Sequence, residues 1–357
     1  MKQNYSYDRA KVAEYFSLEA TINGMLKNFE NLFGLDFEEV TGRANVWHED
    51  VQVYSVWDAE EQGGGFLGYL YLDLYAREGK GESAFNFNLQ PGFLKQEGTR
   101  QFCSTVLSCS LPKPSSKSPC LLYHWNVVIL FHELGHGIHN LVSKTLYARF
   151  HGTAVAVDFG EAPSQMLEQW CYIPTFLKSL GQHYSYDSPE SFNSWEAKAN
   201  GAPRPPIQLP DEMIQNIVRL RPTSSASSEA IKDMDLAQEY HKLIREIKMF
   251  DIPDQSSEWS RSFSTFPHFV HEYDAGYYSY LFSQAYSTEI FYTAFRSDPM
   301  SRKQGLRFRQ CVLERGGSQD EMKSLTDFLG RAPTIEPFYE SLGLNRDGSE
   351  YKDLTLT

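Results

Sequence analysis

The chain has 357 residues, of which 41% are hydrophobic and 14% aromatic, enough to build a sizeable folded core. Its net charge of −13 argues against binding to nucleic acid or anionic membranes, which require clustered Lys and Arg. We see neither a leader peptide nor an apolar run long enough to cross a bilayer, and the five cysteines lack C-x-x-C spacing. We therefore expect a cytoplasmic protein with free thiols, and consider a mitochondrial location less favoured.

In the first part of the chain, the spacing between hydrophobic residues changes from one segment to the next. Between residues 9 and 34 apolar residues recur mostly at steps of three and four, which predicts an amphipathic helix ending near Gly34. Beyond residue 44 the period is two, which is typical of strands. Strands are predicted around 51–53, 66–75, 83–89 and 102–111. A glycine-rich turn at 61–65 joins the first two, and we interpret the set as a small antiparallel sheet.

The most informative motif follows a Pro/Ser-rich connection at 112–119 and the apolar run 127–130, whose length supports a helix. His132 and His136 lie four residues apart, so a helix would project both imidazoles from one face, where they can share a metal ion. Glu133 then lies where its carboxylate can take a proton from water. The alternative is a helix with two buried, hydrogen-bonded histidines, and a third ligand decides between the two interpretations.

Glu161 is the candidate third ligand, because the 25 residues that separate it from His136 leave room for a turn and a returning element. It lies within the segment 158–170, which we interpret as the start of a second helix. Two His and one Glu, with one position open, form the shell used by zinc peptidases. Asp158 and Glu168 are candidates to orient a ligand imidazole. A helix cap and a solvated face explain these two carboxylates equally well.

Three motifs in this region resemble the thimet oligopeptidase family, which includes neurolysin, saccharolysin and their fungal relatives. The motifs lie at 132–139, 150–153 and 158–168. The resemblance covers nearly the whole chain, and it implies a zinc metalloendopeptidase that cuts internal bonds of short peptides. The ligands it implies for one Zn²⁺ ion are His132, His136 and Glu161. It also implies that Glu133 is the catalytic base.

A tyrosine-rich segment at 268–280 would by itself be interpreted as aromatic packing. The resemblance gives it a catalytic role, because this segment of the family supplies groups that stabilise the oxyanion formed from the attacked carbonyl. The positions that match are His268, Tyr273, Tyr277 and Tyr280. On a helix the three tyrosines would share one face, and Tyr280 is the first choice for the oxyanion donor.

The fold implied is mainly α, of the α+β class: a zincin-like, neurolysin-type catalytic region with a small antiparallel sheet before the metal-binding helix. We expect residues 1–111 to form N-terminal helices and the sheet, and residues 112–357 a helical zinc-binding subdomain, packed together as one unit. Further helices are expected at 229–249 and as a pair after Gln319.

Compared with the family, we expect the chain to correspond to the catalytic half only, without the N-terminal helical half. The passage 200–239 is also shorter, and 269–272 replaces a glycine-rich loop. Two hypotheses follow. The chain is either a zinc-dependent oligopeptidase or a truncated, catalytically weak peptide-binding remnant that keeps the zinc site. Cleavage preference and oligomeric state do not follow from the sequence.

Overall fold

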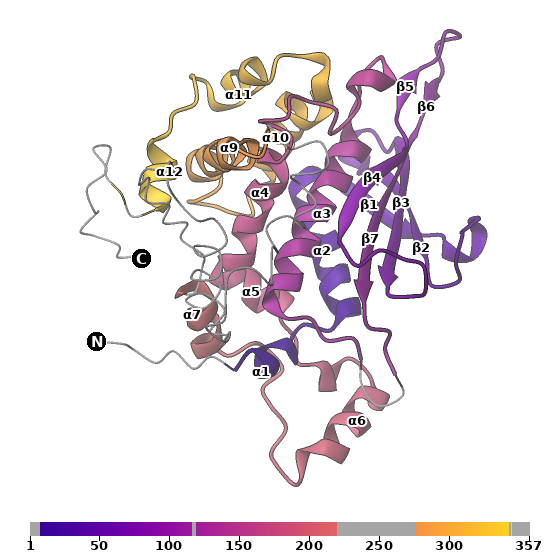
Figure 1. The fold of residues 1–357 in the computed structure, drawn as a ribbon, viewed down its shortest axis with the longest axis vertical. Coiled ribbons are helices and arrows are strands. Elements are labelled where there is room, and N and C mark those ends of the chain that lie inside the picture. The colour runs from indigo at the N-terminus through magenta and orange to yellow at the C-terminus, as the bar shows by residue number, and fades with distance from the viewer. Residues whose placement is uncertain (1–7, 116–118, 220–275, 343, 345–357) are drawn as a thin grey trace, which may run out of the picture.

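The protein is arranged as a sheet layer and a helical layer (Figure 1). The computed structural model describes residues 8–115, 119–219, 276–342 and 344. A five-stranded sheet forms the first layer, and the two longest helices near it, α2 (Leu18–Phe33) and α3 (His124–Val142), lie between the sheet and the other helices. This combination of many helices with one small mixed sheet confirms the α+β class.

The N-terminal region contains two helices where the sequence predicts one over 9–34. The short helix α1 (Arg9–Ala13) is followed by extended backbone at residues 16–17, which form isolated β-bridges with other parts of the chain, and α2 begins only afterwards. The end of α2 is as predicted. Gly34 adopts a φ of 64°, a left-handed conformation that glycine enters without a steric penalty.

The main sheet is mixed, so the prediction of a wholly antiparallel sheet is wrong. Its strands are β1 (Leu35–Glu39), β2 (Gln52–Asp58), β3 (Phe66–Tyr75), β4 (Phe85–Gln90) and β7 (Cys103–Leu111). They lie in the order β1-β2-β3-β7-β4, and β3 pairs with β7 in parallel. The cause is that β7 inserts between β3 and β4, whereas a two-residue period identifies a strand without identifying its neighbours.

A small hairpin, β5 (Phe93–Leu94) with β6 (Arg100–Gln101), leads from β4 into β7. The helix α3 packs on the main sheet. Leu134 and Ile138 of α3 belong to the same buried cluster as Leu70 of β3. The helix that carries the predicted metal motif is thus held against the sheet by apolar contacts.

The remaining helices are α4 (Ala162–Glu168), α5 (Pro174–Leu180), α6 (Pro189–Ala199), α7 (Asp211–Arg219), α9 (Ser279–Ala294), α10 (Arg302–Cys311), α11 (Glu321–Leu329) and α12 (Glu336–Ser341). Most of them lie on the side of α3 away from the sheet, whereas α6 lies apart at the lower end of the molecule (Figure 1). α4 packs against both α3 and α9. The last two helices confirm the pair predicted after Gln319, whereas the helix predicted at 229–249 lies outside the described residues.

The hydrophobic core is one cluster that draws on both predicted subdomains, 1–111 and 112–357. The boundary between them stays a prediction. All five cysteines are free thiols, and four of them are buried. Within the described part of the chain, every helix is too short or too polar to cross a membrane.

Candidate metal centre

The centre begins with two imidazoles on α3. His132 and His136 are one helical turn apart, and their rings meet edge to face with an interplanar angle of 84°. Their Nε2 atoms lie 3.2 Å apart. Both side chains are largely buried, with exposures of 17% and 14%. Two nitrogen atoms of the kind that bind metal ions are therefore directed at one place with little access for water.

A carboxylate from the next helix completes the group. Glu161 is the N-cap of α4, and Pro163 in the first helical turn favours the start of the helix at this point. Its Oε2 lies 3.0 Å from Nε2 of His132 and 3.1 Å from Nε2 of His136. Ser164 also donates its hydroxyl to this oxygen, over 3.2 Å. The structure thus brings together the three residues that the sequence predicts as ligands.

The dimensions of this cluster suit a small cation. The three ligand atoms of His132, His136 and Glu161 form a nearly equilateral triangle with sides of 3.0, 3.1 and 3.2 Å. Tetrahedral zinc, with N and O ligands at about 2.0–2.1 Å, has its ligand atoms about 3.3 Å apart. The donor set also matches, because zinc accepts neutral imidazole nitrogens and carboxylate oxygens. These residues therefore fit a zinc ion.

The carboxylates at the cluster favour a bound cation, either a proton or a metal ion. Burial opposes protonation of His132, but hydrogen bonds to the carboxylates of Glu161 and Glu168 outweigh it and raise the pKa of His132 to about 10. Burial would likewise raise the pKa of Glu161, yet hydrogen bonds from the two imidazoles hold that pKa well below its usual range. A proton or a metal ion is stabilised here by the same groups.

Glu168, at the end of α4, has the geometry of a residue that orients a ligand. Its Oε1 lies 2.7 Å from Nδ1 of His132. Because a carboxylate accepts, Nδ1 donates to it, and in the neutral ring that binds a metal ion Nε2 presents its lone pair to the cluster. Asp158 has no such contact among the described residues. Its backbone carbonyl accepts a hydrogen bond from Ser283 over 2.8 Å.

Glu133, the predicted base, is next to the first ligand but on another side of α3. Burial raises its pKa, an effect opposed by the two imidazoles and by the backbone N–H of Asn86 in β4. A carboxyl group with a raised pKa suits proton transfer near neutral pH. No sequence signal points to Asn86, because it acts through its backbone and only the position of β4 brings it there.

The structure describes two of the four residues that the resemblance assigns to the oxyanion, since His268 and Tyr273 lie outside the described residues. Tyr277 belongs to a turn and Tyr280 to the first turn of α9, so a single helical face does not carry both. Their ring centroids are 5.2 Å apart. Gln165 of α4 donates to the carbonyl oxygen of Tyr280 over 3.2 Å, which holds the start of α9 against the helix that carries the third ligand. The catalytic role of the hydroxyls stays a prediction.

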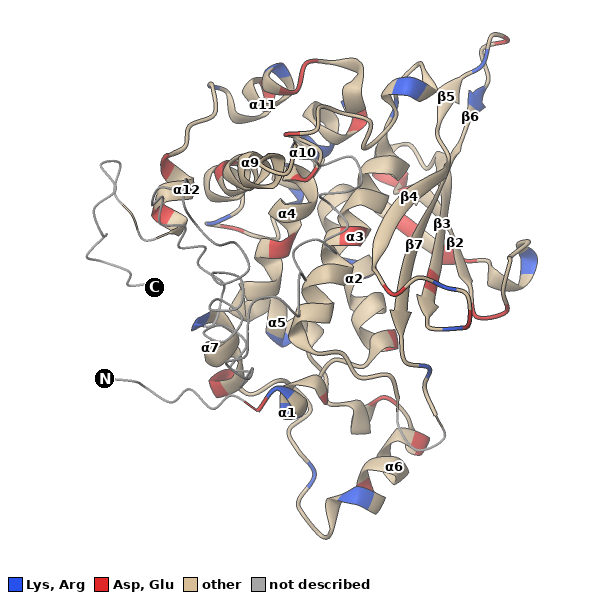
Figure 2. Ribbon diagram, viewed as in Figure 1, with Lys and Arg blue, Asp and Glu red and all other residues tan. Residues whose placement is uncertain are grey.

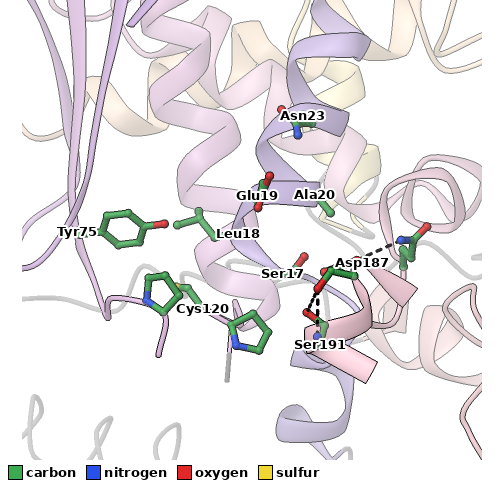
Figure 3. Close-up of a pocket in the computed structure, with 13 residues that line it drawn as sticks. Ser17, Leu18, Glu19, Ala20, Asn23, Tyr75, Cys120, Asp187 and Ser191 are labelled. Atoms are coloured by element: carbon green, nitrogen blue, oxygen red, sulfur yellow. Dashed lines mark hydrogen bonds between the residues drawn. The ribbon is translucent and has the colours of Figure 1, made fainter. Parts of the chain in front are cut away.

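A cavity of about 390 Å³ lies elsewhere, at the start of α2, and its lining includes Ser17, Glu19, Tyr75 and Asp187 (Figure 3). It contains two carboxylates and no imidazole among its lining residues, so it does not resemble the metal centre. Acidic and basic residues are spread over both layers rather than gathered on one element (Figure 2). Among the described residues, the cluster on α3 and α4 is the one group suited to a metal ion.

An α+β fold that gathers two helix-borne imidazoles and a carboxylate around one point, with a second carboxylate beside them, has the groups of a metal-dependent hydrolase. The profile described as "Peptidase family M3" matches residues 1–344, and the chain belongs to this family. The predicted family is therefore confirmed.

Several curated relatives support this assignment. The chain is 36% identical to saccharolysin of Saccharomyces cerevisiae, with 96% of the chain and 48% of saccharolysin covered. It is 32% identical to thimet-like oligopeptidase of Dictyostelium discoideum (96% and 50% covered) and 28% identical to oligopeptidase A of Escherichia coli (95% and 49%). The chain thus spans about half the length of these relatives. A solved M32 carboxypeptidase from Deinococcus radiodurans resembles it only distantly, with a TM-score of 0.42 at 13% identity over 93% of this chain and 59% of that one.

Proposed function

We propose that the chain is a zinc-dependent endopeptidase that hydrolyses internal bonds of short peptides. The observation that carries the proposal is the convergence of His132, His136 and Glu161, whose ligand atoms lie within 3.2 Å of one another in a member of a peptidase family. The names of the relatives support the substrate class, since several of them are oligopeptidases.

One Zn²⁺ ion would be held by Nε2 of His132, Nε2 of His136 and Oε2 of Glu161. When bound, zinc supplies Lewis acidity, which polarises a carbonyl group and makes water more acidic. Glu168 keeps the proton of His132 on Nδ1, so that the ring offers its lone pair. The near burial of the two imidazoles limits competition from bulk water.

Glu133 moves the proton in the proposed reaction. Its carboxylate accepts a proton from the attacking water as the new C–O bond forms, and it delivers this proton to the leaving amine nitrogen as the C–N bond breaks. Water and the peptide bond are converted into a carboxylic acid and an amine without an acyl-enzyme. The raised pKa of Glu133 suits both transfers, because its carboxyl group can hold the proton between them.

The negative charge that develops on the carbonyl oxygen requires hydrogen-bond donors. We propose Tyr280 as the first donor, with Tyr273, Tyr277 and His268 as further groups of the same segment. A phenol O–H is a suitable donor to an oxyanion. The contact between α4 and the first turn of α9 supports this, because it keeps Tyr280 beside the helix whose N-cap is Glu161.

The edge of the sheet offers a way to bind an extended peptide. β4 is the outermost strand on its side of the described sheet, and it lies against α3. A substrate can add to such an edge as a further strand through main-chain hydrogen bonds, which depend little on its sequence. We also propose the zincin-like fold, which is supported by the packing of α3 on the sheet.

A cytoplasmic location stays a proposal, since the relatives include mitochondrial intermediate peptidase of Arabidopsis thaliana. Fractionation of cells that express the full-length protein would test it. Recovery of the protein in the mitochondrial fraction would overturn it.

The function is tested with purified protein, its zinc content, and a fluorescence-quenched short peptide. We expect about one zinc per chain and cleavage inside the peptide. Glu133→Gln should bind zinc equally well but lose roughly 100-fold or more in kcat, the usual contribution of general acid–base catalysis. If both proteins bind zinc and cleave equally slowly, the endopeptidase proposal fails and the peptide-binding remnant is the better description.

A further inference from the structure

The polar side chains of the edge strand β4 point toward the body of the protein. Its apolar residues Phe85, Phe87 and Leu89 are 41%, 46% and 43% exposed, whereas Asn86 and Asn88 are half-buried and directed at α3. A shift of this strand by one residue would turn the apolar side chains inward. Burial of apolar surface therefore does not explain the observed register with β7, and polar contacts must hold it.

The contacts converge on Asn140 of α3, which is 1% exposed. Its Nδ2 donates to Oδ1 of Asn86 over 3.1 Å and to Oγ1 of Thr105 over 3.3 Å. Its Oδ1 accepts from Nδ2 of Asn88 over 3.0 Å and from Thr153 twice, from its backbone N–H over 3.1 Å and its hydroxyl over 3.3 Å. One carboxamide thus uses both donors and both acceptor positions, and it binds two inward residues of β4 at once.

The same stretch of α3 connects this network to the predicted base. Glu133, Gly137 and Asn140 share one side of the helix, because they are four and three residues apart. A Cβ at Gly137 would lie only 3.0 Å from Nδ2 of Asn86, so β4 approaches the helix closely at this glycine. Asn86 is therefore held by Asn140 through its side chain, on the same side of α3 as Glu133.

We infer that Asn140 is a positioning residue: by holding Asn86 and Asn88 it sets the register of β4, and it thereby fixes β4 against the side of α3 that carries Glu133. The kinetic consequence of this inference rests on the proposed peptidase function. The effect on the strand does not, so the two are tested by separate measurements.

The first measurement is hydrogen exchange of the zinc-loaded full chain, followed by mass spectrometry of the peptide covering 85–90. Asn140→Leu keeps the side-chain volume but removes all five hydrogen bonds, and we expect exchange in β4 to accelerate about tenfold or more. Ser143→Ala is the matched control. Ser143 is also buried, at the end of α3, and in the described structure its hydrogen bonds go to Gly152, whose N–H donates to it over 2.9 Å, and to Arg100 rather than to β4. Unchanged exchange of β4 in Asn140→Leu, or the same acceleration in the control, overturns the inference.

The second measurement separates kcat from KM on the quenched peptide. We expect Asn140→Leu to lower kcat about 10- to 100-fold, as small misplacements of catalytic groups do, with KM within about threefold and unchanged zinc content. Ser143→Ala should retain kcat within about twofold. An equal loss in both variants, or a loss confined to KM, contradicts the positioning role.

Asn86→Ala provides a milder second variant in case Asn140→Leu folds poorly. It should reproduce part of the kcat loss, and the double variant should be no slower than Asn140→Leu alone, because both changes break one network. Additive losses would contradict the inference. A wild-type protein that cleaves no peptide would refute the proposed function, while hydrogen exchange would still decide the role of Asn140 in β4.

Discussion

Replacing Glu168 by Ala removes the partner that orients one of the proposed zinc ligands. The 2.7 Å contact between its Oε1 and Nδ1 of His132 keeps the imidazole proton on Nδ1. Without it the ring can rotate and adopt the tautomer whose Nε2 carries the proton and cannot bind a metal. Losing such an outer partner typically lowers metal affinity about 10- to 100-fold, which equals roughly 1.4–2.8 kcal/mol. The Glu168 side chain is 33% exposed, so water can replace part of the contact, and we expect a loss near the lower limit.

The assay is a competition titration of zinc against a chromophoric chelator at neutral pH. Glu168→Gln is the matched control, because its amide oxygen still accepts from Nδ1 of His132 but carries no charge, and its affinity should lie between those of wild type and Glu168→Ala. Thermal unfolding with excess EDTA measures separately how much each replacement destabilises the metal-free protein, in which the contact with His132 also contributes, so that zinc affinities are compared only between folded proteins. A dissociation constant for Glu168→Ala within twofold of wild type, in a folded protein, would refute the orienting role.

Three further predictions concern stability. Gly152→Ala should lower the free energy of unfolding by about 2–4 kcal/mol, because Gly152 has a φ of 57° and an added Cβ would overlap Asn140; an unchanged thermal midpoint would contradict this. Asp58→Ala removes one of the two carboxylate partners of Arg309, which is 2% exposed, and leaves Glu314 as the other, so urea unfolding should show a loss of about 2 kcal/mol, whereas the double replacement with Arg309→Met should recover part of it. Burial lowers the pKa of His151 to about 4, so the unfolded chain binds its proton near pH 6.5 and the native protein only near pH 4. The contribution of His151 to the free energy of unfolding should therefore fall by about 1.4 kcal/mol per pH unit as the pH decreases between these values. In His151→Gln, the slope of the free energy of unfolding against pH, measured in urea, should be smaller by that amount.

Features that depend on a few neighbouring residues were predictable from the sequence. The spacing of His132 and His136 places both rings on one side of any helix, because the direction of a side chain follows from the local backbone geometry. The end of α2 at Gly34 has the same local origin. Glu161 could be proposed from spacing and from the resemblance to a known family, although its approach to the imidazoles depends on the path of residues 143–160.

Tertiary structure alone decided how the strands pair and what holds the edge strand. The alternation in β4 indicates a strand but also suggests that Phe85 and Phe87 face the core, whereas both are exposed. The parallel pairing of β3 with β7 and the bond between Asn140 and Asn86, 54 residues apart, join distant segments. Local sequence patterns carry no information about which distant groups meet, because those contacts form only when the sheet and α3 pack together. The spacing of the two ligand histidines is therefore determined by the sequence alone, whereas the surroundings of the predicted base Glu133 are determined by the tertiary structure.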